Sequence, residues 1–292
     1  MERIRHIFQQ RQHMLLEDFE IYHYSDESEP HVSLHFHDFF ECYLLLSGEL
    51  SYQIDSASFA LMTGDLLLIG PNQLHRPLFS STSQPYDRIV LWLSRAFVER
   101  LSSRATDLGA CFSANRFSVI RLPEENRVHL TNLLFELLDA GETKEFGRDV
   151  LCRSLVAGLL VYINRISVGK NQPLPRSDVR VSELVKRVAS YLDEHLGESV
   201  TLDELSSTVF LSKYYLERQF KKETGVSIYR MLLQKRMIHA RNLMRAGLPL
   251  TQVALSCGFS EYSGFYKAFR NEYGMSPHEY LVCLKGIGSI PV

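Results

Sequence analysis

The sequence predicts an α+β chain made of two unlike parts, an antiparallel β-barrel followed by an all-α region. Between residues 31 and 93, short apolar segments alternate with turn residues such as Ser47-Gly48, which is typical of an antiparallel sandwich or barrel. After Pro123 the apolar residues recur at helical spacing. From Thr201 to Tyr280 one helical pattern occurs twice, and such a repeat implies two copies of one module.

Composition restricts the chain to globular proteins of more than one domain. Its 292 residues suffice for two domains, and a 45% apolar content excludes a disordered chain. Because no apolar run approaches about 18 residues and the opening Met1 to His6 is polar, we expect a cytoplasmic protein with no membrane partner. The five cysteines are scattered without a C-x-x-C pair, which favours reduced core thiols: Cys42, Cys111, Cys152, Cys257 and Cys283.

The net charge of −2 conceals an asymmetry between the two ends of the chain. From Ser177 onward there are 15 Lys and Arg against 12 Asp and Glu, a net charge of +3, which leaves −5 for the preceding residues. A basic C-terminal part favours binding to nucleic acid there.

The predicted elements divide the chain into four stretches: a barrel over 1–122, a helical pair over 123–168, a linker over 169–178, and a helical domain over 179–292. The expected strands are Tyr22–Tyr24, Phe40–Leu46, Leu50–Ile54, Phe59–Met62, Leu66–Ile69 and Tyr86–Leu93. The helical pair runs from Pro123 to Gly141 and from about Lys144 to Ile166, the second with an apolar face of Val150, Leu151, Leu155, Leu159 and Ile163. A helix over Val179–Leu196 opens the last domain.

The first copy of the repeat reads as a helix-turn-helix. Thr201 and Glu204 have capping-box spacing, Ser212 is placed to cap the next helix, and Gly225 ends that helix. Leu216 and Phe220 form its apolar stripe. Its polar residues fall off this stripe and are expected to face outward: Lys213, Tyr214, Glu217, Arg218 and Lys221.

The second copy follows about 48 residues later. It is expected to comprise a short helix over Val253–Phe259 and a helix over Glu261–Asn271 capped by Ser260. Between the copies, Ser227 is placed to cap a helix from about Ile228 to Ala246. A helix of that length spans about 28 Å, which suits two helices that enter successive major grooves one DNA turn, about 34 Å, apart.

This arrangement resembles the AraC/XylS family of bacterial transcription regulators, through Leu211-Ser212, Arg218, Phe220-Lys221, Cys257-Gly258-Phe259, Phe269-Arg270 and Gly274 to Pro277. The resemblance implies base-reading residues at Tyr214, Glu217 and Arg218, and at Tyr262, Ser263 and Lys267, with Arg270 beside them. Arg218 can bond a guanine edge twice, and Glu217 can accept from a cytosine amino group. Two features depart from the family pattern: Gly264 lies inside the second helix, and Arg and Lys are exchanged at 267 and 270. They favour a second recognition helix that reads bases less strictly than the first.

The spacing His35-x-His37-x3-Glu41-x6-Gly48, with Gly64 and His75, resembles the two motifs of the cupin family. His35 and His37 are expected to alternate on a strand and so share one face. In metal-binding cupins these positions, with Glu41 and His75, hold a divalent metal, and the donor set suits Fe, Mn, Ni or Zn. The alternative is that the same residues line an effector pocket or anchor a turn. Gly70-Pro71-Asn72 departs from the Pro-x-Gly of the family.

Together the two resemblances imply a transcription factor, not an enzyme, with a barrel that binds a small-molecule effector. Imidazoles, Glu41 and the aromatics Phe36, Phe39, Tyr43 and Tyr52 would suit a sugar or another small polar molecule. The resemblance also implies double-stranded DNA and RNA polymerase as partners, activation as the commoner outcome, and a homodimer through the helical pair, which could instead only pack on the barrel. The rival readings are a metal-dependent cupin enzyme with a DNA-binding tail and a constitutive regulator with a structural barrel.

Overall fold

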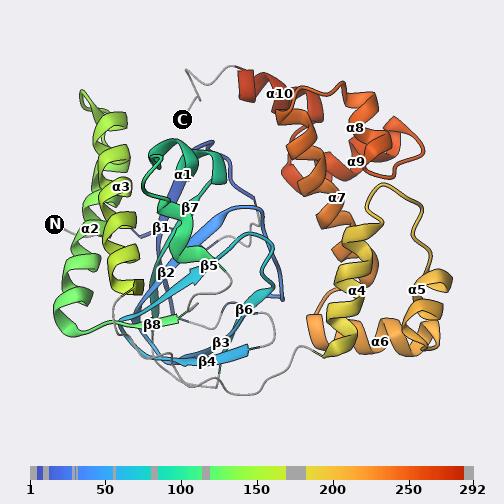
Figure 1. Cartoon of the computed structure of the whole chain (residues 1–292), viewed down its shortest axis with the longest axis horizontal. Helices are drawn as coiled ribbons and strands as arrows, with labels where there is room; N and C mark the ends of the chain where they lie inside the picture. The colour runs from blue at the N-terminus through green and yellow to red at the C-terminus, as the bar shows by residue number, and fades with distance from the viewer. Residues whose placement is uncertain are drawn as a thin grey trace. The chain divides into compact units, whose positions relative to one another are not determined.

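The computed structural model of the chain describes residues 5–8, 13–27, 30, 32–54, 57–79, 85–113, 119–168 and 182–285 (Figure 1). The chain separates into two compact units, Met1–Arg180 and Val181–Val292. The linker predicted over 169–178 lies outside the described residues.

The first unit contains two antiparallel sheets. Its strands are β1 (Phe19–Asp26), β2 (Phe40–Ser47), β3 (Leu50–Ile54), β4 (Ala57–Leu61), β5 (Asp65–Ile69), β6 (His75–Leu78), β7 (Tyr86–Leu93) and β8 (Val119–Arg121). The five-stranded sheet has the order β1-β7-β2-β5-β8, and the three-stranded sheet has the order β4-β3-β6. The α+β fold class is confirmed, but the described strands pair into two sheets and form no single closed barrel.

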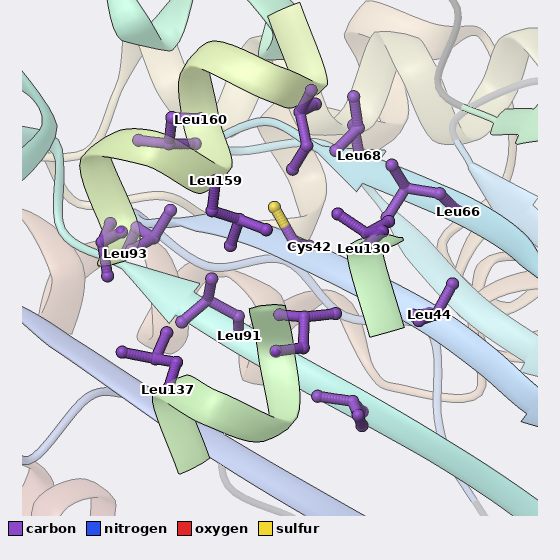
Figure 2. Close-up of a cluster of buried hydrophobic side chains, with 14 of the residues drawn as sticks. Cys42, Leu44, Leu66, Leu68, Leu91, Leu93, Leu130, Leu137, Leu159 and Leu160 are labelled. Carbon is purple, nitrogen blue, oxygen red and sulfur yellow. The ribbon is translucent and has the colours of Figure 1, made fainter. Parts of the chain in front are cut away.

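The five-stranded sheet is the middle layer of the first unit. Its side chains alternate between the two faces of the sheet and pack into two separate cores. On β2, Cys42 and Leu44 face the helices, whereas Tyr43 and Leu45 face the smaller sheet. Leu66 and Leu68 of β5 lie with Leu130 of α2 and Leu159 of α3 in the helix-facing core (Figure 2). Burial on both faces explains why β2 and β5 read as continuous apolar runs.

Helices α2 (Glu124–Glu142) and α3 (Arg148–Val168) cover one face of that sheet, and α1 (Arg95–Leu101) and a short 3-10 turn (Leu108–Phe112) precede them. The predicted end of the first helix at Gly141 was wrong, because α2 continues through this residue. The predicted apolar face of the second helix was partly wrong: Val150 and Leu151 are exposed. The face that packs on the core is instead formed by Cys152, Val156, Leu159, Leu160, Ile163 and Ile166.

Helix α3 is the one described helix long and apolar enough to cross a membrane by length and composition. Its apolar residues have another role in this fold, since six of them lie in the core against the five-stranded sheet. The cysteines Cys42, Cys111, Cys152 and Cys257 are free and buried, as predicted for core thiols.

The second unit is all-helical. Its elements are α4 (Glu183–Glu194), α5 (Leu202–Val209), α6 (Lys213–Thr224), α7 (Ile228–Arg245), α8 (Leu250–Ser256), α9 (Tyr262–Tyr273) and α10 (Pro277–Lys285). Helix α4 is shorter than predicted, because Ser182 caps it and accepts a hydrogen bond from the backbone N–H of Val185. It contacts α5, α6 and α7.

The local signals at the first helix-turn-helix are confirmed. Thr201 and Glu204 form a complete capping box at the start of α5. Ser212 and Ser227 cap α6 and α7 through their side chains. Gly225 ends α6 with a positive φ of 79°, a conformation that favours glycine.

At the second helix-turn-helix the predicted boundaries were shifted. Helix α8 begins at Leu250 rather than Val253, because Pro249 occupies the N-cap position, where no backbone N–H is needed. Glu261, and not Ser260, is the N-cap of α9, and its side chain makes no capping bond. Phe265 and Phe269 of α9 pack with Met237 and Met244 of α7 in a separate small core.

Candidate functional site

A buried cluster of His37, Glu41 and His75 lies in the first unit. The nitrogen and carboxylate oxygen atoms of these three side chains all lie within 4.8 Å of one another. Glu41 comes from β2, His75 begins β6, and His37 lies in the segment before β2. The two sheets therefore both contribute to one polar site between them.

His35 belongs to the same group, but the reason predicted from the sequence was wrong. The segment that holds His35 and His37 is not a strand in the structure; His35 makes only an isolated antiparallel bridge with His75. The ring of His35 lies 4.2 Å from that of His75 and 6.2 Å from that of His37, between centroids. The three imidazoles therefore gather through a bridge between segments and not through alternation along a strand.

Each of these three imidazoles is fixed by a backbone carbonyl two residues away. The Nδ1 atoms of His35, His37 and His75 lie 2.9, 3.0 and 2.8 Å from the carbonyl oxygens of Ser33, Phe39 and Gln73, respectively. A carbonyl oxygen only accepts hydrogen bonds, so each Nδ1 must carry the proton. In the neutral ring, Nε2 is then the atom with a free lone pair.

Glu41 is held by two neighbours. The indole Nε1–H of Trp92 donates to Glu41 Oε2 over 2.8 Å, and His37 Nε2 lies 3.1 Å from the same oxygen. Glu41 and Trp92 are register partners on β2 and β7, so both side chains leave the sheet on one face. Trp92 was not predicted as a site residue, because the pairing of two strands 51 residues apart cannot be read from local pattern.

Burial and mutual charge shift the acidity of the cluster. Burial and the nearby His37 lower the pKa of His35 to about 4, and burial, with His35 and His37, lowers the pKa of His75 well below its ordinary value. Burial raises the pKa of Glu41, but the hydrogen bond from His37 and the charges of His37 and His35 outweigh it and hold that pKa below its ordinary value. Imidazole nitrogens beside a carboxylate are a donor set suited to a divalent metal.

The aromatic residues expected around an effector are buried beside this cluster. Phe39 stacks on His37 with ring centroids 3.8 Å apart, and Tyr52 stacks at 6.3 Å from His75. The hydroxyl groups of Tyr43 and Tyr86 form a hydrogen bond. Phe36 is buried as well. Phe39, Tyr43, Tyr52 and Tyr86 belong to the buried core between the two sheets.

The residues predicted to contact DNA lie on the exposed sides of α6 and α9. On α6 all five are exposed: Lys213, Tyr214, Glu217, Arg218 and Lys221. Lys213 is engaged, since its Nζ lies 2.5 Å from Asp203 Oδ1 of α5. Arg218 and Lys221 make no ion pair within the part of the chain that the structure describes.

On α9, Tyr262, Ser263, Lys267 and Arg270 are exposed. Ser263 donates a hydrogen bond to Glu261 at the start of the helix. Together with Tyr266 and Asn271, which the sequence reasoning did not single out, these side chains line one shallow surface hollow. The available signal was helical spacing, since Tyr266 lies four residues after Tyr262 and Asn271 lies four residues after Lys267.

Comparison with known proteins agrees with the division of the chain into a first unit with a buried polar cluster and a second, all-helical unit. The model of the AraC-like ligand binding domain matches residues 19–160, and that of a helix-turn-helix domain matches residues 205–282. The probable transcriptional regulator LumQ of Photobacterium leiognathi is 30% identical over 248 residues, which cover 84% of this chain and 90% of LumQ. The chain belongs to the AraC family of transcriptional regulators.

Two further relatives extend the likeness. The transcriptional activator RhaS of Enterobacter sp. strain 638 is 26% identical over 247 residues, which cover 84% of this chain and 86% of RhaS. The regulatory protein PocR of Salmonella typhimurium is 34% identical over 97 residues, which cover 33% of this chain and 32% of PocR. LumQ and RhaS are named as transcriptional regulators, which agrees with a DNA-binding function.

Proposed function

We propose that this AraC-family regulator reads DNA with α6 and α9 in two successive major grooves and responds to a small molecule bound in its first unit. The observation that carries the proposal is that a single helix connects the two helix-turn-helix modules. The 18 residues of α7 span about 27 Å at 1.5 Å per residue. This length approaches the 34 Å or so of one DNA turn.

The exposed side chains of α6 supply the chemistry for base reading. Arg218 can donate two hydrogen bonds to a guanine, and Glu217 can accept one from a cytosine. Lys213 and Lys221 suit phosphate contacts, which fix position without reading sequence. On α9, Tyr262, Ser263 and Lys267 take the reading role and Arg270 a supporting one.

Activation through contact with RNA polymerase, in the cytoplasm, completes the proposal. It is supported by the relatives named as activators, RhaS among them. The effector is proposed to be a sugar or another small polar molecule, because imidazoles, a carboxylate and tyrosine hydroxyls between the sheets can hydrogen-bond hydroxyl groups. Its binding would bias the chain between DNA-binding arrangements.

The proposed homodimer rests on exposed apolar side chains at one end of the helical pair. Phe146 is fully exposed, and Val150 and Leu151 expose 62% and 48% of their surface. Large apolar groups gathered in this way favour an interface. We expect Leu151→Glu to lower the dimer fraction in sedimentation velocity, whereas Arg165→Glu, at an exposed position near the other end of the same helix, should leave it unchanged. A monomeric wild-type chain would contradict the dimer.

The test of the function is DNA binding by the full chain with and without candidate effectors. Fragments of genomic DNA would be enriched on the protein, and the affinity for the best fragment measured by fluorescence anisotropy across a panel of sugars and sugar acids. The proposal predicts a specific fragment and at least one compound that changes its affinity. Binding of all fragments with equal affinity would overturn the DNA-reading part, and a specific fragment unaffected by any compound would overturn the small-molecule part.

A further inference from the structure

We propose that Gly264 makes α9 select a thymine, because its missing side chain leaves room for the 5-methyl group of that base. This role rests on the proposed function, in which α9 enters a major groove, and it names one base that the helix selects. The sequence alone favoured the opposite, a helix that reads bases less strictly because of Gly264.

No contact among the described residues requires a glycine at this position. Gly264 is the third residue of α9, and its φ does not lie in the left-handed region. A Cβ built there would have one neighbour within 4 Å, the Cδ1 atom of Phe259 at 3.7 Å, which is an ordinary van der Waals contact. Alanine would therefore fit this part of the fold without displacing a neighbour.

The glycine makes the first turn of α9 less stable than alanine would. Inside a helix, glycine loses more conformational entropy on folding than alanine does. The same turn also lacks a side-chain cap, since Glu261 at the N-cap makes no capping bond. A residue that costs stability and that the fold does not require points to a partner outside the chain.

Gly264 lies on the exposed side of α9, beside the proposed base readers. Phe265 and Phe269 form the buried side of this helix, whereas Gly264 is exposed. Lys267 and Asn271, three and seven residues later, share its face of the helix and line the shallow hollow. Because the N-terminal residues of a recognition helix contact base edges, the backbone at Gly264 would lie against a base and not against a phosphate.

The chemistry of the major groove selects the group that fits against this backbone. A glycine permits close approach but offers no side-chain donor or acceptor, so a polar base edge pressed against it would lose hydrogen bonds to water. The 5-methyl group of thymine is the one methyl group that the base edges present in this groove. It loses no hydrogen bond on contact and gains free energy by leaving water.

The first module has a different surface at the equivalent position. Tyr215 is the third residue of α6, and the buried Leu216 follows it as the buried Phe265 follows Gly264 in α9. Tyr215 exposes 52% of its surface, so α6 carries an aromatic ring where α9 has bare backbone. Dependence on a thymine methyl group at this point should therefore be confined to α9.

Deoxyuridine tests this contact directly, because it pairs as thymine does but lacks the 5-methyl group. The full chain would be bound to the selected DNA fragment, and the thymines of the element that Arg218→Ala leaves intact would be replaced one at a time. Fluorescence anisotropy gives each affinity. We expect one replacement to weaken binding by the wild type about 3–5-fold, as the loss of one buried methyl group predicts.

Gly264→Ala should reverse this response. Its Cβ would take the space of the thymine methyl group, so binding to the unmodified fragment should fall about tenfold or more. The variant should bind the critical deoxyuridine fragment more tightly than the unmodified one, because the two methyl groups no longer compete. Its melting temperature should rise by about 2–4 °C, since alanine is the better helix former. Weaker binding by a more stable chain separates a lost contact from a damaged fold.

Tyr215→Ala is the matched control, because it alters the equivalent position of the first module. Whatever the affinity of this variant for the unmodified fragment, the critical deoxyuridine should weaken its binding by the same factor as in the wild type. A reversed response in this control would show that the effect does not belong to α9.

Several results would overturn the thymine contact. One is a wild type that no deoxyuridine in this element weakens, and this measurement needs no variant. Others are a Gly264→Ala chain that binds as the wild type does, that melts at a lower temperature, or that loses affinity equally for both DNAs, as contact with the sugar–phosphate backbone predicts. Each of these, with specific binding by the wild type, leaves the proposed function intact. Equal binding of the wild type to all DNA fragments would reject the proposed function and the thymine contact together.

Discussion

Among single residues, Arg218 offers the most direct test of the proposed DNA reading. It is exposed on α6, and the fold gives it no ion pair among the described residues, so its guanidinium is available to a base. We expect Arg218→Ala to weaken binding to the selected fragment by about 1–3 kcal/mol and to relax the preference at one base position. Competition gel shifts with single-base variants of the fragment measure both effects.

The control for Arg218 is Lys222→Ala, which removes a charge from an exposed residue of the same helix outside the predicted reading set. Loss of a phosphate contact lowers the affinity for all DNA sequences alike. Lys222→Ala should therefore leave the preference at every base position unchanged. If Arg218→Ala also lowered affinity uniformly, its role as a base reader would be rejected.

At the scale of elements, the turns of the two helix-turn-helix modules adopt the same backbone conformation with different residues. Phe210 and Gly258 occupy equivalent turns and both have positive φ, 59° and 73°. A side chain in this conformation costs about 1–2 kcal/mol, and Phe210 is 86% exposed, so it gains little packing in return. A Cβ at Gly258 would lie 2.5 Å from Arg236 Nη2 and 2.9 Å from the Leu196 carbonyl oxygen.

These turns therefore predict opposite changes in stability. Phe210→Gly should stabilise the chain by about 0.5–1 kcal/mol, since the relief of strain exceeds the entropy cost of glycine. Gly258→Ala should destabilise it by about 2 kcal/mol or more, from strain and from the displacement of neighbours. Urea unfolding of both variants tests this. Changes of the same sign would show that the turns are not equivalent.

Local signals in the sequence placed most elements correctly, and tertiary contacts account for the rest. The caps at Thr201, Ser212 and Ser227 were predictable, because a capping side chain bonds a backbone group only a few residues away. The buried face of α3 was not, because several faces of that helix are apolar and only the sheet determines which one packs.

The candidate sites show the same division. The four polar residues of the buried cluster were named through the resemblance to the cupin motifs, yet the reason for their meeting was not predicted. His35 and His75 meet through a bridge between distant segments, and Trp92 reaches Glu41 through strand register. Such pairings depend on the whole sheet, which local pattern does not specify.

At the scale of the whole molecule, the second unit carries its own core and should fold without the first. Phe265 and Phe269 are fully buried against α7, and Val185 and Leu192 of α4 are also fully buried. We expect a protein fragment from Ser177 onward to give a helical circular dichroism spectrum. It should also bind the DNA fragment that the full chain selects. An unfolded spectrum would show that the second unit needs the first.

The reading of DNA by both modules is most directly tested by selection from random-sequence DNA with the full chain. If α6 and α9 each read a major groove, the enriched sites should contain two short elements with centres about 10–10.5 bp apart. Arg218→Ala should relax the element read by α6 and leave the other intact. A single enriched element, or no enrichment at all, would contradict the account.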